Sequence, residues 1–403
     1  MQSTQPRHQL LEIYQVALRA VAGDRAVAAW LAAHPLAGEW AVLAIGKAAG
    51  AMLAGARAGL GSRVREVLVI GKAAHGGRPD AGECWLEGGH PLPDERSLAA
   101  GEALLDFLAR LPEERPLLVL LSGGASALVE VLPEGVDGAQ LAELNRYLLG
   151  SGLGIAEINR VRKRLSLLKG GRLRNYLGER PCVQLLIADV PGDDPAVVGS
   201  GPLLDDPQAG EPLPELPEGF LALLQPPTRQ ASRREVESHI IANNRLALEA
   251  AAERGRAMGL AVYLDDNVWQ GDVMALAESF CQRVLSGPPG LYLLGGECTV
   301  QLPAEPGQGG RNQHLALLAA RHLAGHGNIV LLAAATDGSD GPGSDAGGLV
   351  DGASIARGEQ EGYCVELALA RANAGAFLEA SGDLLSTGPT GTNVMDLLLA
   401  WKW

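Results

Sequence analysis

The sequence predicts an α/β protein with two domains, the first built on a parallel β-sheet. Its 403 residues exceed a typical domain of roughly 100–200 residues. Short apolar runs typical of buried strands alternate with stretches of helical periodicity. A segment dense in proline and acidic residues, 202–230, interrupts this alternation, so we place the domain boundary there and expect domains at 1–230 and 231–403.

The elements of the first domain follow one another in a regular order. Residues 7–34 carry apolar positions near helical spacing and predict helix, and 40–46 is a short apolar run that predicts a strand. Three later strands end in a glycine-rich or acidic loop, at 64–71, 116–124 and 182–193. Alternation of such strands with helices indicates a parallel sheet, and ligands bind such sheets beyond the carboxyl ends of the strands.

The second domain repeats this pattern. Residues 239–266 predict strand, helix and strand in succession. Two further strands with polar endings are expected at 290–302 and 328–341, with a helix at 312–324 between them. We therefore expect a second α/β unit.

Composition excludes several classes of protein. The net charge of −14 disfavours binding to nucleic acid or to an anionic membrane surface. The five cysteines are scattered without a CxxC pair, which argues against a disulfide scaffold or a structural zinc site and favours the cytoplasm. The N-terminus lacks the form of a signal peptide, and no uncharged apolar run of about 18 residues is present.

Two common nucleotide-binding fingerprints are missing. No GxGxxG follows a strand, and Gly46-Lys47 and Gly71-Lys72 lack the upstream glycine of a GxxxxGK[ST] loop. A nucleotide would therefore be bound by another route.

The turn from Ser122 through Gly123 and Gly124 to Ser126 is the first candidate site. It follows an apolar strand and opens an apolar helical stretch, so free N–H groups and two hydroxyls could form a cradle for an anion. Equally, a tight turn between strand and helix needs glycine for backbone reasons alone. The motif by itself leaves both interpretations open.

Residues 159–174 form the densest basic segment of this acidic chain. Val161, Leu165 and Leu168 indicate a buried stripe, whereas Arg162 and Lys169 lie seven residues apart and are expected on one face. That face suits phosphates or a carboxylate. A run of charge is more often only a solvated helix face, but the two glycines after Lys169 favour a binding role.

Aspartates follow two predicted strands. Asp189 and Asp193 come after the strand that begins at 182, and Asp337 and Asp340 come after the strand that begins at 328. Mg²⁺ typically takes one or two carboxylates and leaves its other positions to water and phosphate. Aspartate is also an ordinary turn residue, so each alone has a structural explanation.

Other polar loops complete the candidates, and they contain Glu297, Arg311 with Asn312, Thr390 and Asn393. Arg311 follows two glycines at a helix start, where a guanidinium can approach phosphate oxygens as a fork. The alternative is that it caps a helix or pairs with a neighbour.

Several of these segments, in this order, resemble the glycerate 2-kinases that end in a MOFRL domain, some of which carry the older label hydroxypyruvate reductase. The resemblance covers nearly the whole chain. Its segments include LAIGKAAGAM, GGHPLPDERS, LLSGGASALVE, INRVRKRLSLLKGGRL, ADVPGDDPAVVGSGP, LLGGECTVQL, GGRNQHLALLAA, ATDGSDGPGSDAGG and STGPTGTNVMDL. Two departures are visible. Arg164 stands where the family usually has histidine, and the segment before it, SGLGIAEIN, has extra glycine character.

The resemblance implies a Rossmann-like N-terminal domain, a MOFRL domain at about 290–400, and an active site in the cleft between them. The implied reaction is ATP-dependent phosphorylation of D-glycerate to 2-phospho-D-glycerate with Mg²⁺. It places the family's lysine at Lys47 and its arginine at Arg311. The sequence itself is compatible with a homodimer.

Phosphoryl transfer requires positioning and neutralisation of charge. Lys47 and Arg311 would stabilise the transferring group, and Asp189 or Asp193 would hold metal or orient the acceptor hydroxyl. Arg162 and Lys169 would bind either the glycerate carboxylate or nucleotide phosphates. Two rival functions are an NAD(P)-dependent hydroxypyruvate reductase, disfavoured by the missing GxGxxG, and a non-catalytic sugar-acid-binding protein.

Overall fold

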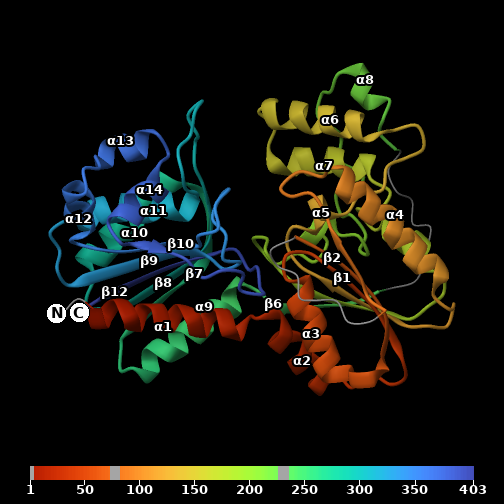
Figure 1. The fold of residues 1–403 in the computed structure, drawn as a ribbon, viewed down its shortest axis with the longest axis horizontal. Coiled ribbons are helices and arrows are strands. Elements are labelled where there is room, and N and C mark those ends of the chain that lie inside the picture. Colours follow the sequence, from red (N-terminus) through yellow and green to blue (C-terminus); the bar gives the residue numbers. More distant parts are fainter. Residues whose placement is uncertain (1–3, 73–81, 226–235) are drawn as a thin grey trace. The chain divides into compact units, whose positions relative to one another are not determined.

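The chain forms two compact units in a computed structural model that describes residues 4–72, 82–225 and 236–403 (Figure 1). The first unit comprises residues 23–241. The second unit comprises residues 1–22 together with 242–403. Each unit has its own six-stranded sheet.

The sheet of the first unit has the strand order β3-β2-β1-β4-β5-β6. Its strands are β1 (Trp40–Ile45), β2 (Val64–Gly71), β3 (Cys84–Glu87), β4 (Leu117–Leu121), β5 (Cys182–Ile187) and β6 (Glu237–Ala242). The pairs β1–β2, β2–β3, β1–β4 and β4–β5 are parallel, which confirms the expected parallel sheet. The strand order reverses between β1 and β4, and this switch point is where doubly wound sheets bind ligands.

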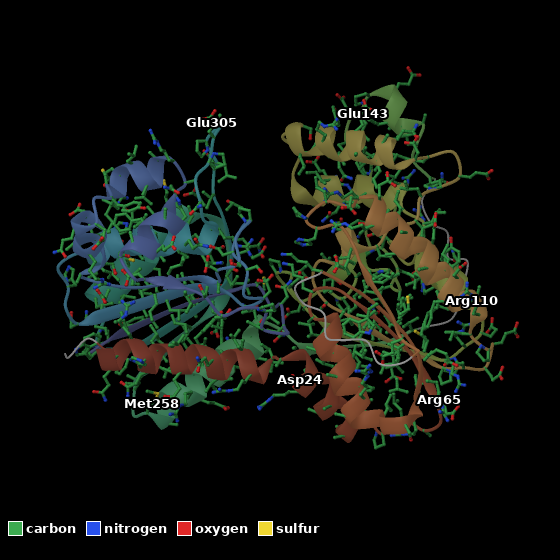
Figure 2. The ribbon with its side chains drawn as sticks, in the orientation of Figure 1. Asp24, Arg65, Arg110, Glu143, Met258 and Glu305 are labelled. Carbon is green, nitrogen blue, oxygen red and sulfur yellow. The ribbon has the colours of Figure 1, made fainter. Side chains whose placement is uncertain are left out.

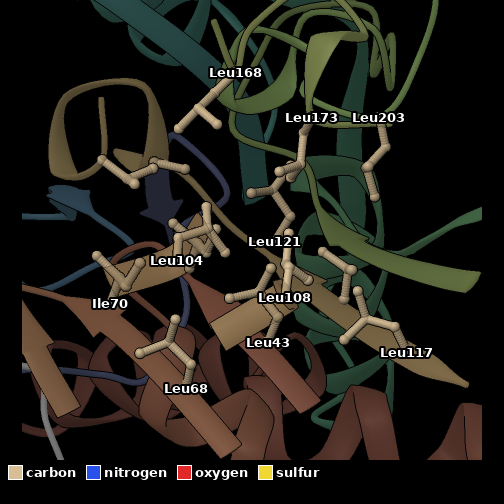
Figure 3. Close-up of a cluster of buried hydrophobic side chains, with 14 of the residues drawn as sticks. Leu43, Leu68, Ile70, Leu104, Leu108, Leu117, Leu121, Leu168, Leu173 and Leu203 are labelled. Carbon is tan, nitrogen blue, oxygen red and sulfur yellow. The ribbon is translucent and has the colours of Figure 1, made fainter. Parts of the chain in front are cut away.

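The strands of the first unit are apolar because helices cover both faces of its sheet. Every residue of β1 and β4 is buried. Helices α2 (Gly23–Ala33) and α3 (Ala49–Leu60) lie on one face, and α4 (Glu95–Arg110) lies on the other (Figure 1). Figure 3 shows the core beneath α4, where Leu104 and Leu108 pack on Leu43, Leu68 and Leu121.

Two further helices of the first unit share a separate apolar cluster. They are α6 (Gly138–Gly150) and α7 (Ile155–Leu165), and residues of 213–224 pack against them, including the short helix α8 (Glu218–Leu221). The proline-rich segment, as far as residue 225, is therefore a packed part of the first unit and does not end it. Its scattered apolar side chains, such as Leu213 and Phe220, pack against this cluster. The prolines between them interrupt the periodic pattern by which such packing is predicted from a sequence.

The sheet of the second unit is mixed, with the order β11-β10-β9-β12-β8-β7. Its strands are β7 (Val262–Asp272), β8 (Gly290–Thr299), β9 (Ile329–Ala335), β10 (Gly347–Asp351), β11 (Leu384–Leu385) and β12 (Asp396–Lys402). Only the β7–β8 pair is parallel among the described pairs of this sheet, and β12 lies antiparallel between β8 and β9.

Helices also cover both faces of the second sheet. On one face lie α1 (Thr4–Ala20) and α9 (Asn244–Ala257), which pack on each other (Figure 1). On the other face lie α10 (Val273–Ser286), α11 (Arg311–Leu323), α12 (Ser354–Gln360), α13 (Val365–Ala370) and α14 (Ala374–Ala380).

The two units differ from the division at residue 230. Helix α1 belongs with the C-terminal sheet, where the Tyr14 hydroxyl donates to the Ala335 carbonyl at 2.9 Å. Strand β6 belongs to the first sheet, although residues 239–242 were expected to open the second unit. Both placements depend on contacts between segments far apart in the sequence.

Charged side chains line the outside of the first unit. Figure 2 shows Arg65, Arg110 and Glu143 at its surface, as expected for residues that are costly to bury. In the part of the chain that the structure describes, no helix combines the length and apolar character needed to cross a membrane.

Candidate functional site

The loops that follow β1 and β4 are tied together at the switch point of the first sheet. The Ser122 amide donates to the Ile45 carbonyl at 3.0 Å, and the Ser122 hydroxyl oxygen accepts from the Ala48 amide at 3.0 Å. Gly46 has φ +124°, and a Cβ there would lie 2.2 Å from the Ser122 hydroxyl oxygen. The approach of the two loops therefore requires glycine at position 46.

Lys47 leaves this junction toward Gly124. The Lys47 amide donates to the Gly123 carbonyl at 2.9 Å. Gly124 has φ +84°, and a Cβ there would lie 3.2 Å from Cγ of Lys47 and 3.3 Å from Cδ2 of His90. The aliphatic stem of Lys47 and the ring of His90 thus pass directly over the Gly124 backbone.

The structure revises the expected anion cradle at Ser122–Ser126. Ser122 is fully buried and its oxygen is used by the Ala48 amide, so it is a structural residue. The helix that follows, α5 (Ala125–Leu128), has only four residues and offers little dipole to an anion. Ser126 remains accessible, with its oxygen 2.9 Å from that of Ser200 in the loop after β5.

A pocket of about 150 Å³ opens beside this turn in the first unit. Four residues that the sequence predicted line it, namely Gly124, Ser126, Arg162 and Lys169. Three polar residues that sequence reasoning did not single out also line it, namely His90, Glu130 and Asn145. His90 and Glu130 do lie in segments that carried the family resemblance, and that was the available signal for them.

Arg162 is held by one of its three guanidinium nitrogens. Its Nε donates to Oδ1 of Asn145 at 3.0 Å, and Nδ2 of Asn145 donates to the Leu141 carbonyl at 3.1 Å. Within the described parts of the chain, no residue accepts from the two terminal nitrogens of Arg162. Burial lowers the pKa of Arg162, and the charge of Glu130 raises it in part.

Lys169 forms a buried ion pair with Glu130 at the same pocket. The other carboxylate oxygen of Glu130 accepts from the Ser166 hydroxyl at 2.5 Å and from the Val131 amide at 3.0 Å. Glu130 therefore cancels the charge of Lys169. With Arg162 added, the pocket lining carries one net positive charge from these three groups.

Other cations of the basic segment support the fold. Lys163 pairs with Asp206 at 2.8 Å, and Arg174 pairs with Asp205. Arg172 donates to the carbonyls of Lys163 and Ser166 at the end of α7. The predicted buried positions Val161, Leu165 and Leu168 are confirmed.

Arg162 and Lys169 both line the pocket, but the prediction that they share one helix face was wrong. Helix α7 ends at Leu165, so the two residues do not share a helix face. A turn at Ser166, whose hydroxyl oxygen accepts from the Leu168 and Lys169 amides at 3.1 and 3.2 Å, brings Lys169 back to the pocket.

Asp189 and Asp193 lie in the loop after β5. Leu186 of β5 is opposite Leu121 of β4, so this loop leaves the same edge of the sheet as the Ser122–Ser126 turn. Asp193 has φ +51°, a conformation that aspartate tolerates better than most residues. Both side chains are half-buried.

In the second unit, Arg311 is bound by two carboxylates. Its Nε and Nη2 contact Asp396 at 2.6 and 3.1 Å, and Nη2 also donates to Glu297 at 2.6 Å. No acceptor for its Nη1 occurs among the described residues. Burial alone would lower the pKa of Arg311, but the charges of Asp396 and Glu297 outweigh it and hold the pKa above its ordinary value.

Asp340 caps the helix that Arg311 begins. Its two oxygens accept from the amides of Asn312 at 3.0 Å and Gln313 at 2.8 Å. Burial raises the pKa of Asp340 to about 6, although these amides lower it in part. Both oxygens are occupied, so the metal role expected for Asp340 receives no support from this geometry.

The remaining predicted residues of the second unit have local partners. Asp337 accepts from the Ser339 amide at 2.8 Å, and Thr390 donates to the Thr336 carbonyl at 2.5 Å. Asn393 is buried. Among the residues described, no group of three or more His, Cys, Asp or Glu side chains is placed to hold a metal ion.

Glu297 was expected in a loop, and this was wrong. Strand β8 continues to Thr299, and Glu297 pairs there with Gln270 of β7. Extension of the neighbouring strand β7 through Asp272 keeps this glycine-rich stretch extended.

Comparison with known proteins identifies two matching families. Residues 9–217 match the family described as a domain of unknown function, DUF4147, and residues 290–396 match the MOFRL family. A D-glycerate 2-kinase from Thermotoga maritima is 36% identical over 407 residues, covering 96% of each chain. A glycerate 2-kinase from Pyrococcus horikoshii is 34% identical, covering 78% of this chain and 77% of its own. The crystal structure of a glycerate kinase from Thermotoga maritima superposes with a TM-score of 0.84 at 32% identity, covering 99% of this chain and 100% of that one.

Proposed function

Because the chain belongs to the glycerate 2-kinase family with a C-terminal MOFRL domain, we propose that it transfers the γ-phosphoryl group of ATP to the 2-hydroxyl of D-glycerate. The products are 2-phospho-D-glycerate and ADP. Similarity to a D-glycerate 2-kinase over 96% of both chains is the observation that carries this proposal. The switch-point site of the first unit supports it, because cations and a small pocket lie where such sheets bind ligands.

Lys47 is the cation that we assign to the transferring phosphoryl group. Phosphoryl transfer passes through a loose transition state, so the protein acts mainly by positioning and by neutralising charge. The junction of the β1 and β4 loops fixes the Lys47 backbone, and Gly124 leaves room for its stem. From this anchored backbone, the ammonium group would act on the charge that develops on the transferring phosphoryl group.

Arg311 is proposed as a further cation that acts in the transition state. Asp396 fixes the plane of its guanidinium through two hydrogen bonds. Its Nη1 has no acceptor in the described part of the protein and is available to a phosphate oxygen. Its raised pKa keeps it charged throughout the physiological range.

Asp189 and Asp193 are the proposed ligands of Mg²⁺. Their carboxylates are hard oxygen donors at the carboxyl edge of the first sheet, and Mg²⁺ typically takes one or two such groups. Asp340 fits less well because helix α11 uses both of its oxygens. When bound, Mg²⁺ would neutralise charge on the ATP phosphates. In the alternative role, one of these aspartates would orient the acceptor hydroxyl.

We also propose that the enzyme works in the cytoplasm, where ATP is supplied. Its small-molecule partners are D-glycerate and ATP. A net charge of −14 supports the expectation that it does not bind nucleic acid or an anionic membrane.

A paired assay tests the proposed function against its rivals. One reaction contains ATP, Mg²⁺ and D-glycerate with coupled detection of ADP, and the other contains NADH and hydroxypyruvate. We expect ADP formation that depends on D-glycerate, and no oxidation of NADH. Oxidation of NADH without ADP formation would favour a reductase, and binding of the acid without either reaction would favour a non-catalytic protein.

A further inference from the structure

The pocket of the first unit contains a guanidinium that is anchored at one end and open at the other. Resting on the proposed function, we infer that this pocket binds the acceptor acid and that Arg162 recognises its carboxylate. Asn145 is the positioning residue that holds Arg162 in place. This assigns the basic segment to the acceptor acid and not to the nucleotide.

The hydrogen bonding of Arg162 supports recognition of a carboxylate. Asn145 uses only Nε, and the two terminal nitrogens stay available to a ligand. Two parallel N–H groups match the two oxygens of a carboxylate, and an arginine whose plane is already fixed loses less freedom on binding. The bond from Asn145 to the Leu141 carbonyl ties this arrangement to helix α6.

The charge of the pocket selects an acid with a single negative charge. Glu130 neutralises Lys169, so Arg162 is left as the uncompensated cation of the three. An anion with several charges, such as a polyphosphate, would meet the Glu130 carboxylate without a second free cation in this lining. A monocarboxylate neutralises the one net positive charge that Arg162, Lys169 and Glu130 leave in the lining.

The size of the pocket points to the same class of ligand. Its volume of about 150 Å³ is well below the roughly 300–1,000 Å³ of pockets that enclose drug-sized molecules. A three-carbon acid suits this space, whereas a whole nucleotide is too large to be enclosed by it.

The pocket also connects to the proposed phosphoryl site. Gly124 forms part of its wall, and the stem of Lys47 passes over the same glycine. An acid whose carboxylate is bound to Arg162 can therefore direct its hydroxyl end toward Gly124, Ser126 and Lys47.

Steady-state kinetics of Arg162 variants test the inference. Loss of a charged double hydrogen bond should raise KM for D-glycerate on the order of 10–100-fold in Arg162→Ala. KM for ATP should stay within about twofold of wild type, because the nucleotide does not use this pocket. Arg162→Lys should recover part of the loss, since it keeps the charge but not the fork.

A neutral substrate analogue separates recognition of the carboxylate from a general defect. Glyceramide has the shape of glycerate without its charge. Wild type should prefer glycerate strongly, and Arg162→Ala should lose most of that preference. Arg146→Ala is the matched control, because Arg146 is an exposed arginine on α6 beside Asn145 and should retain the wild-type preference. An unchanged preference in Arg162→Ala would overturn the inference.

Asn145 needs a measurement that a purely structural role would not change. Asn145→Asp keeps the shape and the acceptor for Nε, but it loses the donor to the Leu141 carbonyl and adds a negative charge beside Arg162. If Asn145 positions Arg162 for an anion, this variant should raise KM for D-glycerate more than KM for glyceramide. Equal effects on both substrates would show that Asn145 acts only in folding.

Calorimetric titration with D-glycerate distinguishes failure of this inference from failure of the proposed function. If wild type phosphorylates glycerate and Arg162→Ala keeps a normal KM, the function stands and the inference is wrong. If wild type has no kinase activity, the proposed function fails, and the titration still tests the pocket. D-glycerate and D-lactate should then bind to wild type and not to Arg162→Ala, and equal binding to both proteins would overturn the assignment. Thermal unfolding of each variant verifies that it is folded.

Discussion

Gly124 is the single residue on which both the proposed catalytic lysine and the pocket depend. Its φ of +84° is a conformation that side chains rarely adopt, and its missing Cβ leaves room for Lys47 and His90. The same backbone forms part of the pocket wall. The position of the cation and the shape of the acid site are therefore set together.

Lys47→Ala tests the proposed role of that cation. Removal of one preorganised electrostatic contact typically lowers kcat by about 10²–10³-fold. KM for D-glycerate should change much less, because Lys47 acts chiefly on charge that develops during transfer.

Arg311→Lys should also lower kcat, since an ammonium cannot reproduce the fork that binds Asp396.

Lys72→Ala is the matched control for Lys47→Ala. Lys72 also follows a glycine at the end of a strand, but that strand is the neighbouring β2. The kcat and KM values of Lys72→Ala should therefore resemble those of wild type. Near-normal kcat with a raised KM in Lys47→Ala would make Lys47 a substrate-binding group instead.

Asp189→Asn and Asp193→Asn test the proposed metal site. Loss of a charged ligand should raise the Mg²⁺ concentration for half-maximal activity by roughly 10-fold or more, since even outer partners of a metal contribute about that factor. Titration of activity with Mg²⁺ measures this. Asp194→Asn is a suitable control, because an asparagine oxygen can still accept from the Ala196 amide. An unchanged Mg²⁺ requirement in both variants would move the metal role toward Asp337.

Among the charged and polar residues of the pocket, the sequence predicted the two cations but missed the residues that hold them. Arg162 and Lys169 belong to a conspicuous basic segment, whereas Glu130 is an isolated acid 39 residues from its partner Lys169. Asn145 lies inside a helix and has no local motif around it. Glu130 ends a segment that carried the family resemblance, but its place in a pocket with Asn145 follows only when the fold brings α6, α7 and the Ser122–Ser126 turn together.

Helix α11 shows how an element is completed by a distant residue. It begins at Arg311 directly after Gly310, which has no side chain to cap it. Asp340, almost 30 positions later, supplies the missing acceptors for the amides of Asn312 and Gln313. The cap also orients the turn from which Arg311 reaches Asp396.

The raised pKa of Asp340 gives a pH-dependent stability of defined sign. Its pKa of about 6 in the folded protein exceeds the ordinary 3.8, so the folded state takes up the proton first as pH falls. Wild type should therefore gain stability relative to Asp340→Asn between about pH 7 and pH 5. Urea unfolding of both proteins over this range measures the difference. A difference that shrinks as pH falls would contradict the assignment.

Most strands and helices could be predicted, because their apolar periodicity is local. Strand β2 occupies residues 64–71 as expected, and α11 occupies nearly the expected range. The sheet to which β6 belongs could not be predicted, because the local pattern of a short apolar strand does not specify the strands with which it pairs. The packing of 213–224 on α6 and α7 was hidden for a similar reason, because prolines mask its apolar spacing.

For the whole molecule, the main organisational feature is a second unit assembled from both ends of the chain. Helix α1 packs on α9 and on the sheet, and Arg7 binds Asp351 at 2.7 Å and Asp383 at 2.8 Å. Asp383 is almost fully buried, so its charge needs such partners. Sequence order alone assigns α1 to the first domain, and only these long-range contacts correct that assignment.

Arg7→Ala should weaken the second unit selectively. We expect a loss of about 2 kcal/mol in local stability, the usual contribution of charged hydrogen bonds. Hydrogen exchange should become faster in β10, which ends at Asp351, and in β11, which follows Asp383, and it should stay unchanged in β1 and β4. Equal acceleration in both units would contradict the discontinuous organisation of the second unit.

The position of the transferred phosphate tests the central claim most directly. Wild-type protein is incubated with ATP, Mg²⁺ and D-glycerate, and the product is examined by ³¹P nuclear magnetic resonance with authentic 2-phosphoglycerate and 3-phosphoglycerate as standards. We predict a product signal that coincides with 2-phospho-D-glycerate and grows as ADP appears. A signal at 3-phosphoglycerate, or no phosphorylated acid while the enzyme is folded and saturated with substrates, would contradict the account.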